Sequence, residues 1–186
     1  IGGLLERGEI GCAVNVAVGA EAQLAEELIE KTTTPKRVLV VGGGPAGMEA
    51  ARVAALRGHQ VVLMEATGDL GGCINIAKRA PRRHGIGDIT DWLEREVFRL
   101  GVDVHFGTYV TAADVLEMAP DAVIVATGSM PRMDGRQHLA PGIVAEGMER
   151  PHVVSSHELL TARSNRSWGR RAVVFDDTGH YEAVAA

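Results

Sequence analysis

The chain of 186 residues is 46% hydrophobic, which provides enough apolar material for a proper core and favours one domain with part of a second. Its formal net charge is −5 and its basic residues are scattered, so nucleic acid is not an expected partner. No apolar run reaches bilayer length, no signal peptide is visible, and two cysteines argue against a disulfide framework, so we expect a cytoplasmic protein without a membrane partner.

The first part of the chain alternates apolar runs with helical patterns. Residues 1–34 are rich in Gly and Ala, with a short helix predicted over Glu21–Glu30. Lys36–Val41 and Gln60–Ala66 are short apolar runs bounded by turn residues, which predicts two buried strands. Between them, Pro45–Arg57 has a helical composition.

The alternation continues further along the chain. The apolar residues of Asp88–Leu100 fall on one helical face, and strands are predicted at Val102–Phe106 and Asp121–Gly128. A capping-box pattern, Thr111-x-x-Asp114, predicts a short helix between these strands. Strands and helices at this spacing predict an α/β fold, a doubly wound parallel sheet of the Rossmann-like type with right-handed crossovers.

The composition changes after the last of these strands. From Ser129 to Arg171 the chain is polar and rich in Gly, Pro and Arg, which we interpret as a crossing between two domains. Ser155-x-x-Glu158 predicts one capped helix within it, and Ala172 begins a predicted buried strand.

These patterns suggest three parts. Residues 1–34 form a linker, 35–150 an incomplete nucleotide-binding domain, and 151–186 the crossing and the start of a second, similar domain. Ile1 opens the chain without an initiator Met, and Ala186 ends it part way into a predicted helix. The fold is therefore expected to be truncated at both ends.

A glycine-rich loop lies between the first predicted strand and helix. Gly42–Gly47 reads G-G-G-P-A-G, which supplies the G-x-G-x-x-G pattern. Gly42 permits the tight turn, Gly44 lets the backbone approach a pyrophosphate, and Gly47 allows the helix to pack closely on the strand. Glu65 closes the next strand, where an acid accepts hydrogen bonds from a ribose and repels a 2′-phosphate. The loop predicts an adenine dinucleotide site.

Longer stretches carry a resemblance to a known family. "VLVVGGGPAGMEAARVAALRGHQVVLMEA", "LGGCINIA" and "DAVIVATGSMPR" together resemble the FAD domain of the two-dinucleotide-binding flavoproteins. The resemblance implies that the backbone at Gly72 and at Ala126–Gly128 passes the flavin dinucleotide, and that Val110 offers hydrogen bonds to the adenine. Arg79, Arg82 and Arg83 either approach its phosphates or lie in a solvated loop. The implied cofactor-binding set is Gly42, Gly44, Pro45, Ala46, Gly47, Glu65, Ala66, Gly72, Arg82, Val110, Ala126, Thr127 and Gly128.

The segment "GEIGCAVNVAVGAE" narrows the family. It is similar to the linker of multidomain old-yellow-enzyme-type NADH:flavin oxidoreductases, which include 2,4-dienoyl-CoA reductase, trimethylamine dehydrogenase and N-methyl-amino-acid demethylases. The resemblance implies an FMN-binding barrel and a 4Fe–4S cluster upstream, with Cys12 as the fourth cluster ligand. A free cysteine is otherwise usually a small buried residue, and that is the reading we adopt for Cys73.

A pair of acids narrows the resemblance again. Asp176 and Asp177 stand where a second nucleotide loop would carry glycines, as they do in the amine-oxidising branch, and they also suit a helix cap. The resemblance therefore implies an amine dehydrogenase or N-demethylase, with dienoyl-CoA or enoate reduction as the alternative. A structural ADP-binding module without a redox role is a further alternative.

The same resemblance sets the expected partners. They are the rest of the protein's own chain, including the FMN barrel and a C-terminal segment, an electron-transfer protein, and a second copy in a homo-oligomer. Because the resemblance places the catalytic barrel outside this chain, we expect no catalytic residue among these 186 residues.

Overall fold

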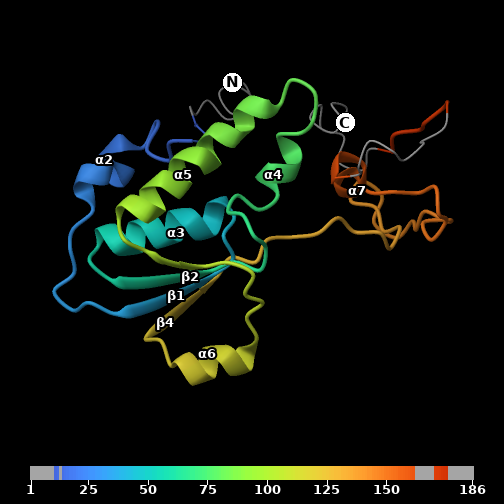
Figure 1. Cartoon of the computed structure of the whole chain (residues 1–186). Helices are drawn as coiled ribbons and strands as arrows, with labels where there is room; N and C mark the ends of the chain where they lie inside the picture. Colours follow the sequence, from blue (N-terminus) through green and yellow to red (C-terminus); the bar gives the residue numbers. More distant parts are fainter. Residues whose placement is uncertain (1–10, 13, 162–169, 176–186) are drawn as a thin grey trace. The chain divides into compact units, whose positions relative to one another are not determined.

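The computed structural model describes residues 11–12, 14–161 and 170–175 (Figure 1). These residues separate into two compact units. The first is made of residues up to Gly72 together with Gly87–Gly128, and the second of Cys73–Ile86 together with residues from Ser129 onward. The acids Asp176 and Asp177 lie outside the described residues.

The first unit is built on a parallel sheet of four strands in the order β3-β2-β1-β4. In the register of the sheet, Val40 of the central strand lies opposite Leu63 on one side and Ile124 on the other. The doubly wound α/β fold predicted from the sequence is confirmed. The strands are β1 (Arg37–Val41), β2 (Gln60–Met64), β3 (Asp103–His105) and β4 (Ala122–Val125).

Two helices cover one face of this sheet. α3 (Pro45–Leu56) and α5 (Asp88–Arg99) lie side by side on it, and α6 (Ala112–Met118) lies on the other side (Figure 1). The two helices close a core with alternate residues of the strands, because successive strand side chains point to opposite faces. The core residues are Val38, Val40, Met48, Ala51, Ala54, Val61, Leu63, Leu70, Leu93, Val97 and Val102.

The second face of the sheet is covered less completely. Leu39 in the central strand is buried, but Val123 and Val125 in β4 are 39% and 73% exposed. β4 is an edge strand of the described sheet. The edge of the sheet therefore presents apolar side chains to solvent.

Both predicted capping boxes are present. The Thr111 hydroxyl accepts from the Asp114 N–H, and the Asp114 carboxylate accepts from the Thr111 N–H at 2.7 Å. Ser155 and Glu158 make the same reciprocal pair at the start of α7 (Ser156–Thr161) in the second unit. α6 ends at Ala119, which takes the left-handed conformation at φ 44°.

The sequence-based expectations about local structure are incomplete in two respects. The helix predicted over Glu21–Glu30 is split into α2 (Glu21–Leu24) and the 3₁₀ turn η1 (Glu26–Leu28), because Ala25 is extended. Neither piece buries a residue, so no packing favours one continuous helix. α4 (Ile74–Ala77) and η2 (His84–Gly87) are short elements that were not predicted.

The strand expected from Ala172 is not formed. Ala172–Phe175 has no assigned secondary structure, and Val173 is 95% exposed. A strand requires a partner for its backbone groups, and no described strand pairs with this segment. In the described part of the chain, no helix is long and apolar enough to span a bilayer.

Candidate dinucleotide site

The carboxyl ends of three strands are fastened together by backbone hydrogen bonds. The Gly42 N–H donates to the Met64 carbonyl and the Ala126 N–H to the Val41 carbonyl, each at 2.8 Å. β1, β2 and β4 therefore end at the same edge of the sheet, and their loops begin there. In open parallel sheets this is the edge where ligands bind.

Two glycines of the loop allow this close packing. Gly42 has φ 107°, and a Cβ there would lie 2.3 Å from the Ala126 carbonyl oxygen. A Cβ on Gly47 would lie 1.8 Å from the Gly42 carbonyl oxygen. Both positions therefore require glycine for the fold itself, independently of any ligand.

Gly44 differs from these two because the protein leaves space beside it. A Cβ on Gly44 would meet only the Gly72 Cα, at an ordinary van der Waals distance of 4.0 Å, whereas a Cβ on Gly72 would lie 3.1 Å from the Gly44 Cα. Gly72 comes from the loop after β2, which is held against the glycine loop by a 2.8 Å bond from the Gly71 N–H to the Gly43 carbonyl. Gly44 and Gly72 thus face each other across a backbone-lined cradle without side chains.

The first turn of α3 supplies the polar groups of this cradle. Gly44 is the N-cap residue, Pro45 opens the helix, and no side chain caps it. The turn carries no acidic residue, so nothing on it repels an anion. The N–H groups and partial positive charge at the start of a helix suit a phosphate. Ala46, on this turn, is exposed.

Glu65 closes the other side of the site as a buried carboxylate. Its Oε2 accepts from the Gly43 N–H at 2.6 Å, and its Oε1 accepts from the Thr67 N–H and hydroxyl at 2.7 and 2.8 Å. Burial alone raises its pKa, but the hydrogen bonds from Thr67 and Gly43 outweigh this effect and hold the pKa below its usual value. Glu65 is therefore charged at neutral pH and fixes the glycine loop as well as facing the site.

Sequence reasoning missed the role of Thr67 and the bond between Glu65 and Gly43. Thr67 follows Glu65 by two residues, which is the spacing at which a carboxylate accepts from a nearby backbone N–H. That signal was available in the sequence. The approach of Gly43 depends on tertiary packing and was not.

The other expected site residues fall into two groups. Ala66, Ala126, Thr127 and Gly128 directly follow β2 and β4 at the shared edge. The segment before Val110 is held at the same edge, because the Gly107 N–H donates to the Thr67 carbonyl and the Thr108 N–H donates to the Glu65 carbonyl.

Arg82 belongs to the second unit. It is exposed and has φ 63°, and its contact with a phosphate stays a prediction.

Both cysteines are exposed. The expectation that Cys73 packs as a buried residue is wrong, since its thiol lies 3.6 Å from the Ser129 carbonyl on the surface. Hydrogen bonds from the backbone of Asn15 and Val14 lower the pKa of Cys12. Within the described residues, no three His, Cys, Asp or Glu side chains gather to hold a metal ion.

Comparison with known proteins identifies relatives that match this chain. Residues 15–137 match the family model described as pyridine nucleotide-disulphide oxidoreductase. Over 96% of the chain, the sequence is 38% identical to an N,N-dimethylglycine/sarcosine dehydrogenase of Chromohalobacter salexigens. It is 35% identical over 98% of the chain to a probable N-methylproline demethylase of Rhizobium meliloti. In each case the chain spans 25% of the relative's length.

A solved structure agrees with these matches. The structure of a 2-naphthoyl-CoA reductase complex superposes with a TM-score of 0.69 and 33% sequence identity. The match covers 81% of this chain and 21% of that protein. The chain therefore corresponds to one part of much longer oxidoreductases.

Proposed function

The chain belongs to the pyridine nucleotide-disulphide oxidoreductase family, and on that basis we propose that its glycine loop binds FAD. The observation that carries the proposal is the cradle at Gly44 and Gly72, where the protein itself leaves room for a Cβ on Gly44 and so does not explain the glycine there. Packing of the loop accounts for Gly42, Gly43 and Gly47, because a Cβ on any of them would lie within 2.4 Å of a neighbouring atom, but it does not account for Gly44.

The residues fit the parts of a dinucleotide. The pyrophosphate would lie against the first turn of α3, which offers N–H groups and no acid. Glu65 ends the second strand, where a carboxylate accepts a hydrogen bond from a ribose hydroxyl in this fold. Its charge disfavours a 2′-phosphate. The backbone at Val110 would serve the adenine, and bound FAD would supply a redox-active flavin ring.

For the whole protein we propose a flavin and iron–sulfur oxidoreductase that acts on N-methylated amines. The names of the two similar curated relatives support this substrate class. The acids Asp176 and Asp177, at the position of a second nucleotide loop, support electron exit to a protein acceptor in place of NAD(P)H. In this proposal Cys12 is one ligand of a 4Fe–4S cluster, and FMN and the catalytic residues lie outside this chain.

Reduction of an enoyl or aryl thioester is the second candidate. It is favoured by the similarity to the 2-naphthoyl-CoA reductase structure, which matches most of the chain. The dinucleotide site is the same in both candidates, so the site itself does not decide between them.

The test compares two glycine variants after nucleotide analysis of the purified protein. Gly44→Ala should weaken nucleotide binding at least tenfold while changing the free energy of unfolding by less than about 1 kcal/mol. Gly47→Ala should destabilise the fold by more than about 2 kcal/mol, because its Cβ would overlap the Gly42 carbonyl. Binding is measured by titration with FAD and ADP, and stability by urea unfolding.

The nucleotide released on heating distinguishes the proposals. FAD supports the redox role, whereas ADP alone supports a structural ADP module. Undiminished binding of both nucleotides to Gly44→Ala would contradict the cradle.

A further inference from the structure

Arg52 is a buried cation at the centre of α3. Its side chain is 7% exposed, and its Nε and Nη2 donate to the two oxygens of Glu49 at 2.7 and 2.8 Å. The guanidinium carbon lies 5.1 Å from the ring centroid of Trp92 in α5, within the range of a cation–π interaction. The hydrogen bonds that Arg52 donates to Glu49 are the largest cause of its raised pKa. Two residues of the helical layer thus hold the cation, and Glu49 is its main carboxylate partner.

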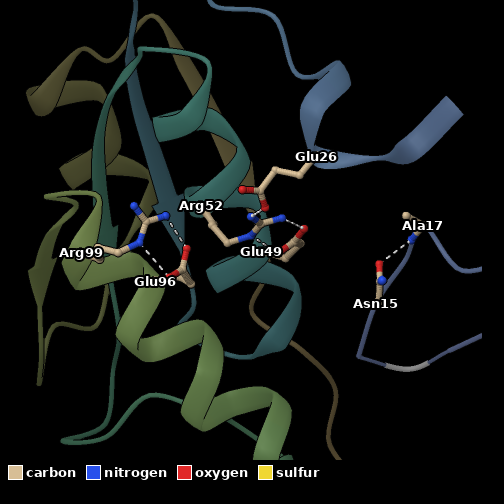
Figure 2. Close-up of polar contacts among 7 residues, drawn as sticks. All are labelled: Asn15, Ala17, Glu26, Glu49, Arg52, Glu96 and Arg99. Atoms are coloured by element: carbon tan, nitrogen blue, oxygen red, sulfur yellow. Dashed lines mark hydrogen bonds and ion pairs between the residues drawn. The ribbon is translucent and has the colours of Figure 1, made fainter. Parts of the chain in front are cut away.

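One N–H group of this guanidinium makes a hydrogen bond to a different segment of the chain. Nη1 donates to Oε2 of Glu26 at 2.5 Å, and Figure 2 shows Glu26 reaching toward α3 from the 3₁₀ turn η1. Among the described residues, this is the only side-chain ion pair or hydrogen bond between residues 11–31 and the helices and sheet.

Apolar packing holds the same segment weakly. α2 and η1 bury no residue, and Leu24 and Leu28 are 48% and 52% exposed. Ala17 is buried but contributes only a methyl group, and its N–H is turned to the Asn15 side chain within the segment. The attachment of residues 14–31 therefore depends largely on Glu26.

We propose that Glu26 and Arg52 form a latch that docks the segment 14–31 on the dinucleotide domain. When the latch opens, Arg52 keeps both hydrogen bonds to Glu49, and Glu26, whose side chain is 51% exposed, passes into water. Only the Nη1 group of Arg52 loses its partner, because its contacts with Glu49 and Trp92 stay within the helical layer. Arg52 acts as a positioning residue for the segment.

The latch limits the movement of Cys12. When it is closed, Glu26 is the described residue nearest to Cys12 that a side-chain hydrogen bond or ion pair holds to the helices and sheet. When it is open, that anchor moves to Thr32, whose N–H donates to the Arg57 carbonyl. The free tether then gains about six residues, or about 20 Å of reach. This consequence for electron exchange between a cluster at Cys12 and the dinucleotide rests on the proposed function, whereas the latch does not.

The test is Glu26→Gln, with Glu27→Gln as the matched control. Glu27 is the neighbouring exposed acid of η1, and its side chain makes no hydrogen bond or ion pair within the described residues. Hydrogen exchange of peptides covering residues 19–31 is measured, because the Leu28 and Ile29 N–H groups bond within the segment. Glu26→Gln should accelerate this exchange three- to tenfold and leave α3 and the sheet unchanged. Glu27→Gln should match the unmodified protein.

Salt supplies a second readout. Because Glu26 is half exposed, salt screens the pair, and the unmodified protein should show faster exchange of residues 19–31 at about 0.5 M salt than at about 0.05 M. Glu26→Gln should show no such dependence.

Two outcomes overturn the latch: equal exchange in the two variants, or acceleration that spreads through α3 and the sheet. Absence of iron–sulfur in the complete protein would instead overturn the proposed role of Cys12 and leave the exchange result intact.

Discussion

At the scale of single residues, Glu65 both stabilises the fold and forms part of the dinucleotide site. Its two oxygens hold the glycine loop through Gly43 and the following turn through Thr67. The same charge faces the place expected for a ribose. A change at this residue should therefore alter the fold and the binding site together, unlike Gly44→Ala.

Glu65→Gln should lower the free energy of unfolding by about 1 to 3 kcal/mol at pH 7, because an amide NH₂ would face one of the present donors. The pKa of Glu65 is lowered in the folded state, so its charge stabilises the fold above the unfolded pKa of about 4.3. This stabilisation is lost as the pH falls through the folded pKa. The difference between the two proteins should therefore shrink in acid, which urea unfolding at pH 7 and at about pH 3 measures.

Glu94→Gln is the control for this experiment, since Glu94 is an exposed acid on α5. It should leave the free energy of unfolding nearly unchanged at both pH values. A constant difference between Glu65→Gln and the unmodified protein across the pH range would contradict the hydrogen-bonded carboxylate.

At the scale of elements, the stability of α6 depends on the residues at its two ends. It buries no residue, so the capping box at Thr111 and the left-handed Ala119 determine its stability. Ala119→Gly should stabilise the protein by about 0.5 to 1 kcal/mol, because an alanine pays a steric cost at φ 44° that glycine avoids. Thr111→Ala should destabilise it by about 1 kcal/mol. Urea unfolding measures both changes, and a destabilised Ala119→Gly would contradict the cap geometry.

The sequence predicted the elements whose signals are local. The Thr111–Asp114 box, the amphipathic face of α5 and the glycine loop each depend on residues close together in the chain, and the structure contains all three. The split at Ala25 could not be predicted, because the absence of packing around α2 and η1 is a tertiary property.

The same distinction applies to the site and its surroundings. The pair Glu49–Arg52 has helical i,i+3 spacing and is visible in the sequence. Its partners Glu26 and Trp92 come from distant segments, and only the packing of α3 against η1 and α5 brings them together. The strand expected at Ala172 failed for a related reason, since an apolar run becomes a strand only beside a partner.

At the scale of the whole molecule, the open edge of the sheet should promote self-association. Val123 and Val125 are exposed on β4, and unpaired apolar edges promote association. The protein should self-associate as its concentration rises, and Val125→Lys should weaken association about tenfold. Sedimentation velocity over a concentration series measures this effect.

Val173→Lys is the matched control, because Val173 is an exposed valine that no strand carries. Equal weakening by both substitutions would indicate general hydrophobic association and would contradict a role for the β4 edge.

The position of β4 beside β1 also sets an order of events during synthesis. The Arg37 N–H and the Asp121 carboxylate, which meet where these two strands begin, are 84 residues apart in the chain. Closing that loop costs about 1 kcal/mol more than bringing β2 to the other side of β1. At about 5 to 20 residues per second, a ribosome needs roughly 4 to 17 s to deliver the missing strand. During that interval the central strand is a nascent edge, and dependence on chaperones should be greatest while residues 38–121 are being translated.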